Sequence, residues 1–256
     1  MTSARALAER LTHRVVVRRR LPPPLPRLPL YTSTEGGLRY LRPSLRKVDQ
    51  TLIRVATRCI NTGDVVWDVG ANLGLFALAA AASAGPTGSV LAMEPDSWLV
   101  SLLRRTAVQD GARAPIEVLP VAASRVSGLE HFNIARRNRS TSHLEGFGST
   151  QTGGTRAHQT VCTMSLDHIL DLRGQPTFVK IDVEGAELEV LSGATALLAS
   201  GPSLLVEVAG EHSAAINKLL RSFGYRIYDA DQSTFSECDL PPYSTLATTS
   251  RQVGTP

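Results

Sequence analysis

The residues best suited to chemistry lie in a turn between two apolar runs, in the stretch VVWDVGANLGLF. Asp68 ends the first run, and Gly70, Asn72 and Gly74 follow it. A carboxylate at the end of a buried strand can pair with an ammonium group, and glycines let a backbone approach a ligand closely. A second acid, Glu94, ends the next apolar run in AMEPD, where a carboxylate can accept both hydroxyls of a ribose. The two acids predict a ligand site.

The spacing of this turn differs from that of a dinucleotide site. A dinucleotide turn reads G-x-G-x-x-G with no acid on the strand before it, whereas here an acid precedes glycines that are four positions apart. The amino-acid part of S-adenosylmethionine offers an ammonium and a carboxylate that such a turn could hold. The alternative is that Asp68 only caps the following helix. We therefore expect S-adenosylmethionine, and not NAD, as the cofactor.

The elements that must position these residues follow a regular alternation. We expect strands at 65–69, 89–95, 116–122, 178–183, 203–208 and 225–230, and helices at 44–60, 73–84, 97–110, 186–198 and 212–223. Buried strands that alternate with helices indicate a mostly parallel sheet covered on both faces. The sequence therefore predicts an α/β fold with a doubly wound sheet.

Two segments fall outside this alternation. Residues 1–43 form a basic, proline-rich arm, in which residues 1–20 could be an amphipathic helix and the prolines of residues 21–30 exclude one. The arm is either a flexible tail with a stiff linker or an arm for a homo-oligomer or another partner. Residues 124–163 are rich in Ser, Thr and Gly, and are either a mobile loop or a lid and substrate loop over the strand ends. The predicted domain covers residues 44–256.

The later motifs resemble those of the FkbM family of methyltransferases. The matching segments are SLDHIL at 165–170, FVKIDVEGAELEVLSGA at 178–194 and LLVEV at 204–208. The resemblance implies a class I, S-adenosylmethionine-dependent methyltransferase with a Rossmann-like, mostly parallel sheet of seven strands. It also implies O-methylation of a small molecule, with a sugar or polyketide hydroxyl as acceptor.

The same resemblance assigns the cofactor site residue by residue. The glycine turn would hold the methionine end, the second acid the ribose, and the residues after the third strand the adenine. The implied cofactor-binding residues are Asp68, Gly70, Ala71, Asn72, Gly74, Glu94, Pro95, Val121, Ala122, Ala123 and Asp182.

Acids and histidines at the strand ends are the candidates for the chemistry. A hydroxyl acceptor loses its proton during methyl transfer, so a base within reach assists. Asp182 and Glu207 would be neighbours if their strands are adjacent; they could share a proton, or hold a divalent cation such as Mg²⁺. His212 is a third catalytic candidate, with a surface role as its alternative. The substrate-binding candidates are Ser140, Ser142, His143 and Glu184, the last of which could instead favour a helix N-terminus.

Composition limits the partners. The net charge is +4, but the arginines gather in residues 5–27, so the basicity is weak support for a nucleic-acid partner. Three cysteines lie far apart without zinc-site spacing, which suits a reducing cytoplasm. No apolar run reaches the ~18 residues of a membrane span. We therefore expect a cytoplasmic protein that acts on a small hydroxylated molecule.

Two alternatives remain beside this interpretation, and one further motif is set aside. The segment DLPPY at 239–243 is close to a motif of amino-methyltransferases, but it follows the last expected strand and we interpret it as a proline turn. N-methylation of a small amine or of RNA is the alternative within enzymes. A binding protein that keeps the methyltransferase fold without the chemistry is the alternative from another class.

Overall fold

The computed structural model describes residues 15–36, 38–41, 44–109, 111, 113–136, 138–148 and 154–249. The described strands are β1 Val16–Arg20, β2 Pro29–Ser33, β3 Val65–Val69, β4 Ser89–Met93, β5 Ile116–Leu119, β6 Ala122–Ala123, β7 Gly128–Ala135, β8 His143–Leu144, β9 Thr155–Met164, β10 Phe178–Ile181, β11 Ser203–Glu207, β12 Arg226–Asp229 and β13 Ser244–Thr248. The α-helices are α2 Gln50–Cys59, α3 Leu75–Ala84, α4 Ser97–Ala107, α5 Leu166–Arg173, α6 Glu187–Ser192, α7 Thr195–Ser200 and α8 Ser213–Ser222. The 3₁₀ helices are η1 Thr34–Gly36, η2 Leu38–Leu41, η3 Leu45–Lys47, η4 Arg139–Thr141 and η6 Gly210–His212.

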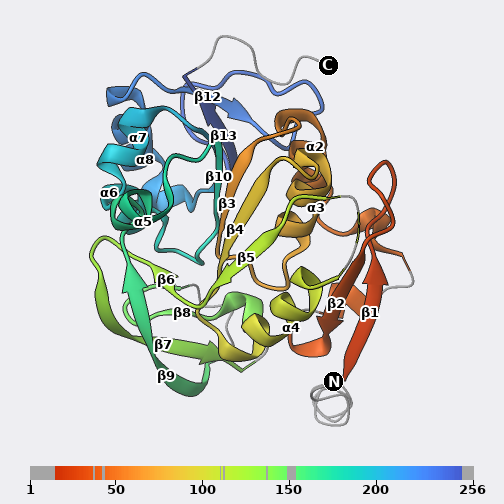
Figure 1. The fold of residues 1–256 in the computed structure, drawn as a ribbon. Coiled ribbons are helices and arrows are strands. Elements are labelled where there is room, and N and C mark those ends of the chain that lie inside the picture. Colours follow the sequence, from red (N-terminus) through yellow and green to blue (C-terminus); the bar gives the residue numbers. More distant parts are fainter. Residues whose placement is uncertain are drawn as a thin grey trace, which may run out of the picture.

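A central sheet of seven strands runs through the molecule in the order β12-β13-β11-β10-β3-β4-β5 (Figure 1). All neighbours from β11 to β5 pair in parallel, whereas β13 pairs antiparallel with β11 and with β12. The predicted doubly wound α/β fold with a mostly parallel sheet is confirmed. The sequence interpretation missed β13, because we took residues 239–243 as the turn after the last strand and this short strand follows them.

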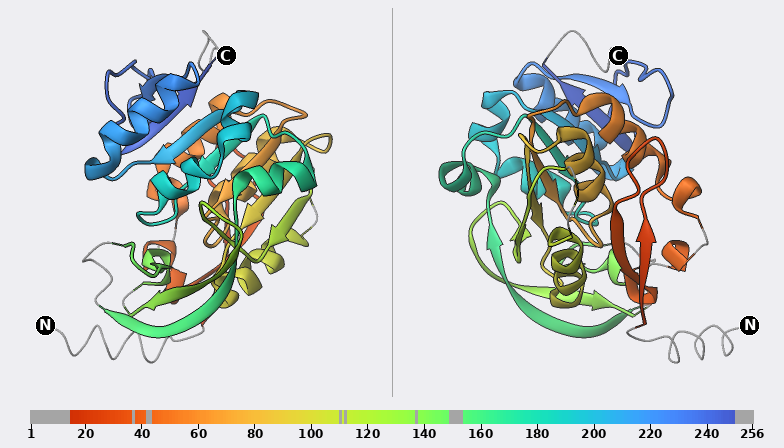
Figure 2. Two further views of the ribbon diagram at one scale, coloured as in Figure 1. Left: turned by 90° about the vertical axis from the view of Figure 1, so that its left-hand side faces the viewer. Right: turned by 45° about the vertical axis from the view of Figure 1, so that its right-hand side comes forward.

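Helices cover both faces of the central sheet (Figures 1 and 2). Helices α2, α3 and α4 pack in one apolar cluster, and α5 to α8 contribute to a second on the opposite face. The single helix predicted over 186–198 is wrong, since α6 and α7 are separate. A side chain at Gly193, between them, would come within 2.4 Å of the backbone oxygen of Arg125, so the chain there fits tightly against another segment.

The described part of the N-terminal arm packs on the domain. Strands β1 and β2 form an antiparallel hairpin, so the helix predicted for residues 1–20 is wrong for Val16–Arg20; residues 1–14 lie outside the described part. Leu21 and Leu30 are buried in the same cluster as α4, and the backbone N–H of Tyr31 donates to Thr106 Oγ1 of α4. A domain boundary at residue 43 stays a prediction.

Residues 122–164, which we call the insert, form a second sheet. Its strands lie in the order β6-β9-β7-β8, and the curved strands β7 and β9 extend across one end of the central sheet (Figure 2). The segments EHFNIA and HQTVCTM lie within β7 and β9. The insert is thus a β-structure wherever it is described, with η4 between β7 and β8.

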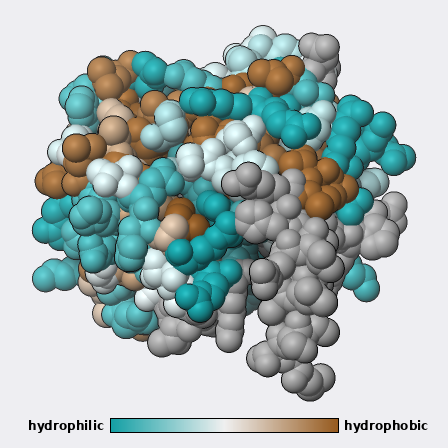
Figure 3. Space-filling model, turned by 90° about the horizontal axis from the view of Figure 1, so that it is seen from below, coloured by the Kyte–Doolittle hydropathy of each residue, from teal (hydrophilic) through white to brown (hydrophobic). Residues whose placement is uncertain are grey.

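The surface seen from below mixes hydrophilic and hydrophobic residues (Figure 3). The exposed large apolar side chains lie on different elements; Leu129, for example, lies on strand β7 and Leu172 on helix α5. Among the described residues, no helix combines the length and the apolar character that crossing a bilayer requires.

Candidate active site

A cavity of about 630 Å³ lies where the parallel strands of the central sheet end. The segments after β3, β4 and β10 and the end of β11 form one wall. The insert forms another, and the start of α2 lies at a third side. A cavity of this size at the carboxyl ends of an open parallel sheet is typical of a small-molecule site.

The glycine turn forms the part of the cavity next to β3. Gly70 has φ 74°, and a Cβ there would lie 1.8 Å from the backbone oxygen of Asp182, so no side chain fits. Gly74 has φ 84° and begins α3. Asn72 also has a positive φ, 53°, which asparagine tolerates better than most residues. Gly70, Ala71 and Asn72 line the cavity, whereas Gly74 does not, since a Cβ there would lie 2.3 Å from Leu103 Cδ1.

Glu94 is fixed beside this turn. Its carboxylate accepts hydrogen bonds from the backbone N–H groups of Asn72 and Asp96, both at 2.8 Å. Burial raises the pKa of Glu94 to about 8, although these two donors oppose the rise. Since the carboxylate also lines the cavity, it can accept from a pair of ligand hydroxyls, as predicted for a ribose.

Asp68 lies deeper than predicted. It is fully buried and does not line the cavity, because Lys180 on the neighbouring strand β10 lies between. Lys180 Nζ is 3.3 Å from Asp68 Oδ1 and 3.3 Å from Asp182 Oδ2, and it donates to the Gly70 carbonyl at 2.7 Å. Lys180 thus connects Asp68 to the glycine turn, and the role of Asp68 toward the ligand stays a prediction.

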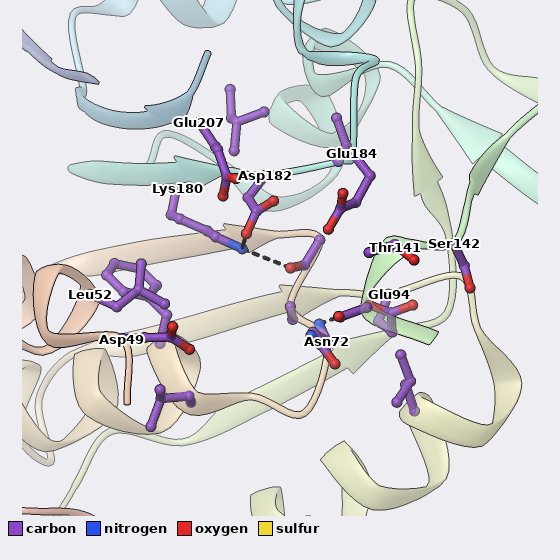
Figure 4. Close-up of a pocket in the computed structure, with 18 of the residues that line it drawn as sticks. Asp49, Leu52, Asn72, Glu94, Thr141, Ser142, Lys180, Asp182, Glu184 and Glu207 are labelled. Atoms are coloured by element: carbon purple, nitrogen blue, oxygen red, sulfur yellow. Dashed lines mark hydrogen bonds and ion pairs between the residues drawn. The ribbon is translucent and has the colours of Figure 1, made fainter. Parts of the chain in front are cut away.

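Asp182 and Glu207 come together as predicted, because β10 and β11 are adjacent and pair Ile181 with Val206. The two carboxyl groups lie side by side on the wall of the cavity (Figure 4). Burial, together with the charges of Asp182 and Glu184, raises the pKa of Glu207 to about 9. Lys180 Nζ, 3.3 Å from Asp182 Oδ2, gives Asp182 a positively charged partner.

Glu184 is the third acid of this wall. It has φ 56° and lines the cavity beside Asp182. Burial and the nearby charges of Asp182 and Glu187 raise the pKa of Glu184 to about 8. The adjacent Glu187 instead accepts from the backbone N–H groups of Val183 and Gly185, which makes it a structural residue of this turn.

The other predicted substrate and catalytic residues divide into two groups. Ser140 and Ser142 line the cavity, and Ser142 lies on the insert wall next to Glu94 (Figure 4). His143 and His212 are not among the residues that line it. His143 Nδ1 lies 3.1 Å from the Thr141 carbonyl, and His212 lies in η6 before α8. The geometry therefore gives His212 no role as the base.

Arg139 is a residue of this site that sequence reasoning missed. Its guanidinium contacts Asp96 through two hydrogen bonds of 2.8 and 2.6 Å and Glu35 through one of 2.5 Å. These partners lie 43 and 104 positions away in the chain, so no local motif signals the contact.

A second missed group lies at the start of α2. Asp49 pairs with Arg39 at 2.8 Å and accepts from the Tyr40 hydroxyl at 3.1 Å, and all three residues line the cavity. Arg39 and Tyr40 lie in the basic arm and Asp49 lies in the helix expected over 44–60, and nothing in the local sequence distinguished the three from their neighbours.

The predicted Mg²⁺ gains no support from the structure. In the described parts of the chain, no three His, Cys, Asp or Glu side chains come together in a group that could hold a metal ion. We derive no step through a metal.

The family follows from comparison with known proteins. The model of the methyltransferase FkbM domain matches residues 68–227. The chain belongs to the FkbM methyltransferase family. It is therefore an S-adenosylmethionine-dependent methyltransferase, as the resemblance predicted. The matched range includes the glycine turn, Glu94, Asp182 and Glu207.

One relative is similar to this chain in sequence, and several solved structures are similar to it in fold. The hexuronic acid methyltransferase AglP of Haloferax volcanii is 33% identical over 177 residues, which cover 67% of each chain. A solved S-adenosylmethionine-dependent O-methyltransferase of Thermotoga maritima matches with a TM-score of 0.47 and 12% identity, over 80% of this chain and 66% of that one. The precorrin-6y C5,15-methyltransferase of Geobacter metallireducens matches with a TM-score of 0.45 and 15% identity, over 77% and 87%.

Proposed function

We propose that this FkbM family member methylates a hydroxyl group of a small molecule, with sugars as the acceptor class. The observation that carries the proposal is the pair of neighbouring carboxyl groups, Asp182 and Glu207, on the cavity wall. A hydroxyl acceptor needs a group that takes its proton, and such a pair supplies one.

The cavity fits the cofactor that the family requires. S-adenosylmethionine, when bound, supplies an electrophilic methyl carbon on a sulfonium. The backbone of Gly70 and Ala71 would hold its methionine end, Glu94 its ribose hydroxyls and Val121–Ala123 its adenine. The collision that any Cβ at Gly70 would cause, and the Glu94 carboxylate that faces the cavity, support this fit.

Glu207 is the proposed base. A carboxylate whose pKa is raised toward the working pH is a stronger proton acceptor than an ordinary one. In its ionised form Glu207 takes the proton of the acceptor hydroxyl as the new carbon–oxygen bond forms. Lys180 keeps Asp182 paired, so that Asp182 does not compete for the proton.

Two observations support a sugar acceptor. Asp182, Glu184 and Glu207 crowd one wall of the cavity, and carboxyl groups bind the paired hydroxyls of sugars well. The similar AglP is named as a hexuronic acid methyltransferase, which is a sugar-directed activity.

Substitution Glu207→Gln tests the proposal. It removes the base but keeps a similar shape, so kcat with a hydroxylated acceptor should fall about a hundredfold or more while affinity for S-adenosylhomocysteine stays within about twofold. The assay is the release of S-adenosylhomocysteine with a panel of hexuronic acids, neutral hexoses and small amines. Glu117→Gln is the control, because Glu117 is an exposed residue of β5 that does not line the cavity.

The pH profile sharpens this test. Because the base acts when ionised, the rate should rise with pH toward the raised pKa of Glu207, about 9, and Glu207→Gln should lose this rise. Methylation of amines alone, or full activity of Glu207→Gln on a hydroxyl, would contradict the proposal.

A further inference from the structure

The insert is fastened to the turn between β4 and α4 by side chains. Arg139 binds both carboxylate oxygens of Asp96, which is fully buried, and its own side chain is 15% exposed. From the neighbouring strand β9, Gln159 Nε2 donates to the Pro95 carbonyl at 3.2 Å. The insert is therefore hydrogen-bonded through η4 and β9 to two consecutive residues of this turn, Asp96 and Pro95.

The same turn carries the acid that faces the ribose position. The backbone N–H of Asp96 donates to Glu94 Oε1, so Arg139 is connected to Glu94 through one residue. Figure 4 shows Thr141 and Ser142, which follow Arg139, beside Glu94 and on the side of the cavity away from Lys180. The polar residues of the insert thus lie at the nucleoside end of the cavity, and the acids Asp182 and Glu207 lie at the other.

The insert also brings apolar surface to this end. Phe132 and Leu144 are buried, belong to one small cluster with Ala122, and line the cavity. Ala122 is one of the residues expected near the adenine. A flat heteroaromatic ring is bound well between apolar side chains, because its faces carry no hydrogen-bonding groups.

We propose that the insert forms the outer wall of the nucleoside site and binds the adenosine part of the cofactor, not the acceptor. Phe132 and Leu144 contact the adenine, and Ser140–Ser142 enclose the ribose beside Glu94. Arg139 is the positioning residue that holds this wall in place. This proposal replaces the expectation that the insert binds the acceptor. It rests on the binding of S-adenosylmethionine and does not depend on the acceptor being a sugar.

Two ligands separate the nucleoside part from the rest of the cofactor. S-adenosylhomocysteine contains the adenosine and the amino acid, whereas 5′-methylthioadenosine contains the adenosine and a thioether only. In Arg139→Met the Kd of both ligands, measured by calorimetry, should rise by the same factor, about tenfold. Unchanged Kd values for both ligands would overturn the proposal, as would a loss confined to S-adenosylhomocysteine.

Arg125→Met is the matched control for this test. Arg125 is also an arginine of the insert and also forms an ion pair, at 2.9 Å with Glu189, but it does not line the cavity. Its substitution should leave both Kd values unchanged. An equal loss in Arg125→Met would mean that any disturbance of the insert weakens binding, which would overturn the specific role of Arg139.

A measurement on the wild-type protein avoids the buried charge that Arg139→Met leaves on Asp96. Hydrogen exchange of residues 138–148 should slow on addition of 5′-methylthioadenosine alone. Exchange there that is unaffected by bound 5′-methylthioadenosine would overturn the proposal. Failure of both ligands to bind the wild type would instead refute cofactor dependence, and failure of the Glu207→Gln test would leave this inference intact.

Discussion

Two walls of the cavity are built in different ways. The sheet wall, formed by the ends of β3, β4, β10 and β11, consists of segments fixed by backbone pairing between parallel strands. The insert wall, formed by Phe132, η4 and Leu144, is joined to the domain by side-chain contacts such as those of Arg139.

The difference affects what each wall can do. The sheet wall holds the groups that need fixed positions, the glycine turn and the carboxyl pair, over a buried lysine. The insert wall depends on a few charged and polar contacts, so single substitutions can loosen it without unfolding the sheet. The substitutions predicted below disturb the sheet wall first and then the insert wall.

The largest expected effect is that of Lys180→Met. The substitution leaves the fully buried Asp68 without its ion-pair partner and frees the Gly70 carbonyl. Breaking a buried pair from one side costs about 3–5 kcal/mol, so the free energy of unfolding in urea should fall by this amount. The exposed pair of Arg173 and Glu117 is the control, and Arg173→Met should cost less than about 1 kcal/mol.

A double mutant tests the cause of this loss. If the penalty of Lys180→Met comes from the uncompensated charge on Asp68, then adding Asp68→Asn should recover part of it. Additive losses in the double mutant would contradict the account of Lys180 as the partner of Asp68.

The next effect is that of Gly70→Ala. The new Cβ would meet the Asp182 carbonyl at 1.8 Å, in addition to the strain of a positive φ. We expect a loss of about 2–4 kcal/mol in thermal unfolding and a clear loss of affinity for S-adenosylhomocysteine. Gly174→Ala separates the two causes, because Gly174 has a similar φ of 77° with nothing within 4 Å of its Cβ position. Equal losses in both variants would show that the collision contributes nothing.

The smallest effect concerns the insert wall. Gln159→Leu removes one neutral hydrogen bond to the Pro95 carbonyl. The Kd of 5′-methylthioadenosine should rise only about threefold, and the melting temperature should hardly change, because one such bond contributes about 0.5–1.5 kcal/mol. A larger effect than that of Arg139→Met would reverse the proposed roles of the two contacts.

The sheet wall could be predicted from the sequence because its signals are local. Apolar runs of strand length, each followed by an acid or a glycine, located Gly70, Glu94 and Asp182 at the strand ends. Adjacent strands then brought Asp182 and Glu207 together as expected. Periodicity and turn residues are properties of short windows, and they suffice where backbone pairing decides the position.

The insert wall and the depth of Asp68 could not be predicted, because distant residues decide them. Arg139 finds its partners 43 and 104 positions away, and no local pattern encodes such a contact. Asp68 is buried beside Lys180, which is its register partner on β10 and not a sequence neighbour. Strand β13 was missed because its five residues after a double proline give too short an apolar pattern.

Calorimetric titration of the purified protein with S-adenosylhomocysteine, with NAD as the comparison ligand, tests the central claim most directly. That claim is that the two walls together enclose a site for the methyltransferase cofactor. The account predicts saturable binding of S-adenosylhomocysteine at a single site, with no heat from NAD. Absence of S-adenosylhomocysteine binding, or binding of NAD at the same site, would contradict it.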